Sequence, residues 1–198
     1  MAAQILLMRR ALALGSVEKG VYRVRGDARI NGEPAQAGRE IRAGDAITTG
    51  PGAELVFVIG RDAYMVRERS SLSFGADVLR VATGAVLSVF GRGAKRIETP
   101  TATIGIRGTG VYVESEPQRT YVCTCYGEAE LAARDDPASR EVVRTRHHEA
   151  PRYIMASGAP RMLMEAPVVN HSDAELILLE SLVGRQPPFT ETDATPYR

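Results

Sequence analysis

Short apolar segments alternate with Gly, Pro and Asp from Val21 to about Leu131, with a turn signal roughly every 8–12 residues. In the segment Ala53–Ile59, alternate residues would share one buried face of an extended strand, and Gly60 ends the run. No window in this region shows the roughly 3.6-residue period of an amphipathic helix. The pattern predicts an all-β fold, a sandwich or roll of many short strands, because stacked or closed sheets cover unpaired strand edges.

The sequence changes character after residue 132, where a C-terminal extension (residues 133–198) begins. Residues 133–146 are rich in charge and contain an Asp-Asp-Pro turn signal, which predicts an exposed loop that leads into a strand at 141–145. Residues 147–169 contain three prolines, so only short extended pieces fit there.

One α-helix is predicted over residues 173–183. Ser172 and Glu175 have the spacing of a capping box, in which each side chain satisfies a backbone amide that the first turn leaves unpaired. Leu and Ile residues follow, and Gly184 ends the helix. Because the helix is apolar on most sides, we expect it to pack against the β-domain or, if the domain offers no groove, against a partner.

The N-terminal segment, residues 1–19, has two interpretations. An Arg-Arg pair precedes an apolar run, as in a twin-arginine export signal, but Glu18 and Lys19 follow too early for a complete signal. A short packing helix that ends at Gly15 is the favoured interpretation, and a remnant of an export signal is the alternative.

A chain of 198 residues can form one main domain, and its composition excludes some classes of protein. The 25 basic and 24 acidic residues give a net charge of +1, so there is no overall positive field to hold nucleic acid. No stretch reaches the roughly 18 apolar residues of a membrane span, so we expect no integral membrane segment.

Four turn motifs follow one another in the β-region: Gly26–Gly32 (GDARING), Ala43–Gly50 (AGDAITTG), Glu98–Ala102 (ETPTA) and Ile106–Val111 (IRGTGV). Together they resemble the FecR-type domain, and the resemblance covers about residues 20–132. It implies an all-β domain outside the cytoplasm that brings no catalytic residues with it. The best-known members of the family pass the signal of an outer-membrane receptor to a sigma factor, through a cytoplasmic arm and one membrane span.

That transmembrane signalling role is not expected here, since neither a membrane span nor a cytoplasmic arm precedes the β-domain in this sequence. The resemblance implies instead a stand-alone periplasmic or extracellular module of the cell envelope that senses a signal or serves as a scaffold. A protein partner or self-association is expected for a module of this kind.

The glycine-rich segment Gly105–Gly110 does not predict a nucleotide site. A dinucleotide-binding motif leads from a strand into a helix, whereas the residues from Val111 onward have the pattern of another strand. We therefore interpret the segment as a tight turn that needs a positive φ.

Both cysteines and all three histidines lie between residues 123 and 171: Cys123, Cys125, His147, His148 and His171. Two cysteines two positions apart on a strand project to the same face, with parallel Cβ vectors and Cα atoms about 6.5–7 Å apart, which disfavours a disulfide between them. Two thiolates and two imidazoles suit tetrahedral zinc, with copper or iron ranked below it. The sequence therefore predicts one metal ion at these residues, with zinc favoured.

The histidines are not equivalent in this prediction. His147 and His148 are adjacent, so on a strand they point to opposite faces and at most one of them reaches the cysteines. His171 directly precedes the helix, whose dipole disfavours the protonated imidazole. The acidic residues near enough in sequence to support the ligands are Asp173, Glu175 and Glu149.

Three alternatives stay open for the cysteines and histidines. The thiols could simply fill the core while the histidines are solvated, since the spacing matches no established zinc-finger pattern. Redox or disulfide chemistry is the second alternative, and a cysteine nucleophile paired with histidine is the third, although no signature of a hydrolase accompanies the cysteines. We expect a non-enzymatic module, with a metal-free interaction or self-assembly module as the competing function.

Overall fold

The computed structural model describes residues 19–189. The predicted N-terminal helix or export-signal remnant lies outside these residues. In the described part of the chain, fourteen strands form one continuous hydrogen-bonded sheet, and a single helix, α2 (Asp173–Leu182), follows them. The prediction of an all-β fold with one C-terminal helix is confirmed, and the helix ends one residue before the predicted boundary.

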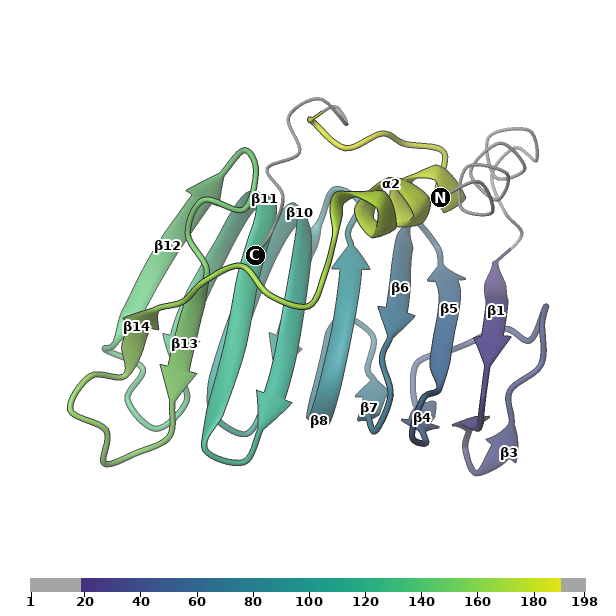
Figure 1. The fold of residues 1–198 in the computed structure, drawn as a ribbon, viewed down its shortest axis with the longest axis horizontal. Coiled ribbons are helices and arrows are strands. Elements are labelled where there is room, and N and C mark those ends of the chain that lie inside the picture. Colours follow the sequence, from purple (N-terminus) through teal and green to yellow (C-terminus); the bar gives the residue numbers. More distant parts are fainter. Residues whose placement is uncertain (1–18, 190–198) are drawn as a thin grey trace.

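The sheet folds over itself into two layers (Figure 1). The front layer of the figure contains, in order of pairing, β1 (Gly20–Arg25), β5 (Glu54–Ile59), β6 (Asp62–Val66), the second half of β8 (Val78–Val89), the second half of β10 (Ala102–Glu116), the first half of β11 (Arg119–Ala133), β13 (Arg152–Met155) and β14 (Leu163–Glu165). The rear layer contains β3 (Glu33–Pro34), β2 (Ala28–Ile30), β4 (Ala46–Thr49), β7 (Ser71–Phe74), the first half of β8, β9 (Ala94–Glu98), the first half of β10, the second half of β11 and β12 (Arg140–Thr145). The three long strands therefore belong to both layers.

The long strands change layers at irregular positions. Gly84 lies in β8 between the part that pairs with β7 and the part that pairs with β6. Its φ of +86° is in the left-handed region, and an added Cβ would lie 2.2 Å from Oγ of Ser70. In β10 the register with β11 shifts between Arg107 and Val111. The tight turn predicted for the segment Gly105–Gly110 is thus a bulged bend inside one continuous strand.

Two apolar clusters stabilise this arrangement. The larger cluster lies between the layers and includes the fully buried side chains of Ile30, Phe57 and Ile104. The second cluster lies on the outer face of the front layer, where α2 covers it by packing on β6 and β8. The helix residues that enter this cluster most deeply are Leu176, Leu179 and Leu182. The helix therefore packs against the β-domain, which is the first of the two predicted arrangements.

The C-terminal extension continues the sheet. β12 and β13 both pair with β11, and β14 pairs with β13, so the strands after residue 132 share the hydrogen bonding of those before it. Among residues 19–189, no helix has the length and apolar character that a bilayer crossing requires.

Candidate metal centre

Strand β11 carries the two cysteines to the outer face of the front layer. Cys123 and Cys125 lie two positions apart and belong, together with Tyr121, to the cluster beneath α2. Both side chains are fully buried and both thiols are free. The shared face that the sequence predicts for the two cysteines is confirmed.

His148 reaches the cysteines from the bend that follows β12. Its backbone has a φ of +54°, and its amide donates to the carbonyl oxygen of Cys125 over 2.9 Å. This hydrogen bond fixes the bend against β11. It leaves Nδ1 of the His148 ring 3.3 Å from Sγ of Cys123, and the side chain is buried.

His171 arrives from the connection that leads into α2. Its Nδ1 donates a hydrogen bond of 2.6 Å to the carbonyl oxygen of Val169, and its Nε2 lies 2.9 Å from Nδ1 of His148. The ring stacks on Tyr112 with the ring centroids 4.6 Å apart and the planes inclined by 24°. The imidazole is therefore held both by its face and by its outer nitrogen.

Asp173 orients the other imidazole. One carboxylate oxygen, Oδ1, accepts hydrogen bonds from Nε2 of His148 over 3.1 Å and from Nε2 of His147 over 3.0 Å. Asp173 lies in the first turn of α2, where the helix dipole stabilises a negative charge. A carboxylate behind a histidine ring is the usual support of a metal ligand.

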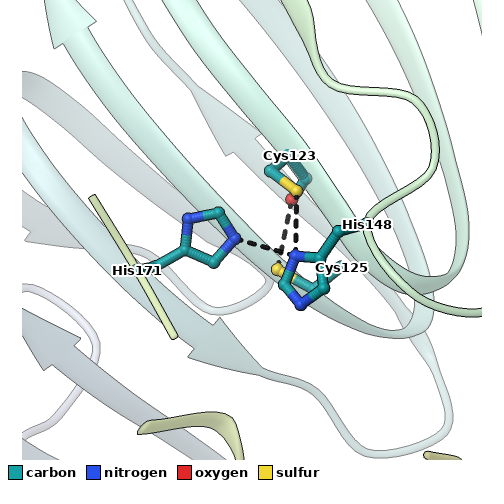
Figure 2. A group of neighbouring side chains, drawn as sticks. All are labelled: Cys123, Cys125, His148 and His171. Atoms are coloured by element: carbon teal, nitrogen blue, oxygen red, sulfur yellow. Dashed lines mark hydrogen bonds between the residues drawn. The ribbon is translucent and has the colours of Figure 1, made fainter. Parts of the chain in front are cut away.

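The four candidate ligand atoms, two sulfurs and two ring nitrogens, converge on one point, as Figure 2 shows. One atom each from Cys123, Cys125, His148 and His171 lies within 4.8 Å of all the others. The outer nitrogen of each ring faces a group that only accepts hydrogen bonds, so it carries a proton. The inner nitrogens, Nδ1 of His148 and Nε2 of His171, lie 2.9 Å apart. Two nitrogens at this distance either share one proton or, without it, direct both lone pairs at one bound cation.

Two of the separations are close to those of a tetrahedral zinc site. Zinc–nitrogen bonds of about 2.0–2.1 Å and zinc–sulfur bonds of about 2.3 Å place the ligand atoms roughly 3.4–3.8 Å from one another. The nitrogen–nitrogen distance of 2.9 Å and the sulfur–nitrogen distance of 3.3 Å are slightly shorter. Outward shifts of about half an ångström would admit the ion. This buried Cys/His cluster could therefore hold a metal.

The two thiols differ in their tendency to ionise. Burial opposes ionisation of Cys123, but hydrogen bonds from Cys125, His148 and His171 outweigh burial and hold the pKa of Cys123 well below its ordinary value. Burial raises the pKa of Cys125, and the neighbouring sulfur of Cys123 raises it further. The cluster thus favours one thiolate beside one thiol, and a bound metal ion would also displace the second proton.

The structure brings four of the five predicted ligands together and places the fifth to one side. His147 directs its Nε2 at Asp173, and its ring lies 4.5 Å from that of Phe189. His147, His148 and Asp173 form a second, overlapping group of donor atoms. The other acidic candidates act elsewhere: Glu175 pairs with Arg67, and Glu149 accepts a hydrogen bond from the amide of Arg146.

Two supporting groups were missed by the sequence analysis. Tyr112 lies directly opposite Cys123 in the pairing of β10 with β11, so a correct hairpin register would have placed it beside the cluster. The carbonyl oxygen of Val169 carries no signal in the sequence, because any residue supplies a backbone carbonyl.

No protein-family model matches this sequence, and no curated protein matches it. Two crystal structures of a protein described as a putative anti-sigma factor from Parabacteroides distasonis ATCC 8503 are similar to it. Each has 12% sequence identity and a TM-score of 0.50. The similarity covers 61% of this chain and 58% of that chain, so it spans little more than half of the other protein. At this identity the likeness concerns the fold alone.

Proposed function

We propose that this protein is a non-enzymatic, FecR-like β-module that works outside the cytoplasm as a sensing or scaffolding part. It holds one metal ion, with zinc favoured over copper or iron, at Cys123, Cys125, His148 and His171. The turn motifs support the FecR-like assignment, and the shared fold with a protein described as an anti-sigma factor is consistent with a regulatory role.

The metal proposal rests on one observation, the convergence of two sulfur atoms and two imidazole nitrogens. The other nitrogen of each ring donates a hydrogen bond away from the cluster. The ligands come from three separate segments: β11, the bend after β12 and the connection into α2. An ion there would tie the extension to the outer face of the front layer. All four ligands are buried, as in structural rather than catalytic zinc sites.

The metal content of the purified protein tests this proposal. The chain is expressed in medium that contains zinc, copper and iron, purified without chelators, and examined by elemental analysis. We expect about one equivalent of zinc in the wild type and almost none in Cys123→Ser and His171→Ala.

His147→Ala is the matched control, because His147 directs its Nε2 at Asp173 and contributes no atom to the group of Cys123, Cys125, His148 and His171. This variant should keep its zinc. Loss of metal in His147→Ala together with retention in Cys123→Ser would assign the ion to the overlapping group of His147, His148 and Asp173. A wild type without metal would overturn the proposal.

The competing function is an interaction module without metal. It is favoured by β12 and β14, which each pair with one strand only and carry the exposed apolar side chains of Val142 and Met164. Sedimentation of the wild type and of Val142→Lys distinguishes the interaction module from the module that holds a metal. Concentration-dependent association that the lysine variant abolishes, in protein that contains no metal, would support the interaction module.

A further inference from the structure

A cavity lies at one end of the roll, at a distance in sequence from the cysteines and histidines. Its walls are the β5–β6 turn, the β7–β8 loop, the β8–β9 connection and Ala43 from the loop before β4. The cavity has a volume of about 310 Å³. This volume is at the lower end of the range of about 300–1,000 Å³ that is typical of small-molecule sites.

The floor of the cavity is aromatic. Tyr64 packs edge-to-face on Phe74 and on Phe90, with ring centroids 5.3 Å and 5.7 Å apart. All three side chains belong to the core between the layers and are buried. Only their edges line the cavity, so an apolar group that enters it meets side chains already held in place by the core.

The rim of the cavity carries an excess of positive charge. Nζ of Lys95 lies 3.7 Å from Oδ2 of Asp62 and 3.6 Å from Oδ1 of Asp77, so one cation forms ion pairs with two carboxylates. Arg61 and Arg92 also line the cavity, and among residues 19–189 neither guanidinium forms an ion pair. Three cations against two carboxylates leave one positive charge.

The remaining charged groups do not remove this excess. Arg96 is the fourth basic residue on the rim. It shares the carboxylate of Glu98 with Arg80, at 2.8 Å and 3.1 Å, so Glu98 has no charge left to offset Arg61 or Arg92. The carboxylate of Asp62 already accepts a hydrogen bond of 2.8 Å from the amide of Gly91. A second contact orders the rim, because Arg185 donates to the carbonyl oxygen of Arg61 over 2.6 Å.

We propose that this cavity binds a small organic anion of single charge with an aromatic or other apolar body. Its carboxylate or sulfonate group pairs with Arg61 and Arg92, whose planar guanidinium groups match such anions. Its apolar body lies on the floor formed by Tyr64, Phe74 and Phe90. For the sensing module proposed above, this anion would be the molecule that is sensed. Binding at this cavity does not depend on the metal centre.

Calorimetric titration of the full chain with two probes of equal shape tests the proposal. The probes are 1-naphthoate and the neutral 1-naphthalenemethanol. We expect 1-naphthoate to bind with a stoichiometry of one and the alcohol to bind at least about tenfold more weakly, because only the anion meets the uncompensated charge.

Three variants locate the binding. Arg92→Gln should lower the affinity for 1-naphthoate by about tenfold. Ala76→Trp places a large side chain on the exposed wall of the cavity and should abolish binding. Arg140→Gln is the matched control, because Arg140 is exposed on β12 and does not line the cavity, and its affinity should equal that of the wild type.

The proposal fails if 1-naphthoate does not bind at millimolar concentration, if the alcohol binds equally well, or if Ala76→Trp binds as the wild type does. Circular dichroism of each variant separates a lost site from a lost fold. The same titration on His171→Ala should give the wild-type affinity, so failure of the metal proposal leaves this result unaffected.

Discussion

Nδ1 of His148 and Nε2 of His171 lie 2.9 Å apart, although both rings donate from their opposite nitrogens, to Asp173 and to the carbonyl oxygen of Val169. Across this distance the two inner nitrogens can share one proton or direct both lone pairs at one cation. A cation bound between these nitrogens and the two sulfur atoms would take the place of that proton. The following predictions concern this cluster first and the fold that builds it second.

Removal of the metal should lower the thermal stability of the wild type. An ion that binds only the folded chain stabilises it by about 4 kcal/mol when its free concentration is roughly 1,000 times the dissociation constant. Thermal unfolding with and without a strong zinc chelator measures the effect as a fall in Tm. Cys123→Ser should have the lower Tm from the start and should not respond to the chelator. Equal responses of both proteins would contradict a bound ion at this cluster.

Asp173→Asn should weaken zinc binding by about 10–100-fold, because the carboxylate that orients His148 is lost while the shape of the side chain is kept. Competition with a chromophoric zinc chelator measures the affinity. Glu175→Gln is the control on the same helix, since Glu175 pairs with Arg67 and contributes no atom to the group of four ligands. If the two variants lose affinity to the same extent, the effect comes from the helix rather than from the carboxylate behind His148.

Gly84→Ala should be far more destabilising than Gly32→Ala. The two glycines have similar φ values, +86° and +83°, so the conformational cost of about 1 kcal/mol is common to both. A Cβ on residue 84 would lie 2.4 Å from Cα of Ser70, whereas a Cβ on residue 32 meets nothing within 4 Å. Urea unfolding should show an additional loss of several kcal/mol for Gly84→Ala, or no folded protein at all. Similar stabilities would mean that β8 does not pass so close to Ser70.

The ion pair between Glu141 and Arg152 should make a small, pH-dependent contribution to stability. Hydrogen bonds from Arg152 lower the pKa of Glu141, against the smaller opposing effect of burial. A lowered pKa in the folded state stabilises the protein above the ordinary pKa of 4.5, and this stability is lost as the pH falls through the lowered value.

Glu141→Gln should therefore cost at most about 1 kcal/mol at pH 7, because water screens a carboxylate that is 38% exposed. Urea unfolding of both proteins from pH 7 down to pH 3 measures the difference, which should shrink as the pH falls below about 4.5. A difference that grows toward acid pH would reverse the sign and contradict the prediction. Arg140→Gln provides the comparison. Arg140 lies on the same strand as Glu141, and its N···O distance to Glu130 is 4.0 Å.

Much of the fold was predictable because its causes are local. The nearly continuous apolar run Ala53–Ile59 specifies a strand, and the structure buries its two faces in the two clusters on either side of the front layer. The capping box of Ser172 and Glu175 specifies where α2 begins, and the carboxylate of Glu175 accepts from the amide of Ser172 over 2.9 Å. The common face of Cys123 and Cys125 follows from the pleat of one strand.

The tertiary structure decided which distant groups meet. The sequence alone predicted that at most one of His147 and His148 reaches the cysteines but did not decide which. Only the positive φ of His148 and its backbone hydrogen bond to Cys125 turn that ring toward them. The sequence also did not indicate that Tyr112 would stack on His171. Strand periodicity and helix caps are encoded within a few neighbouring residues. The meeting of β11, the bend after β12 and the connection into α2 depends instead on how the whole sheet folds over, because long-range packing determines which segments become neighbours.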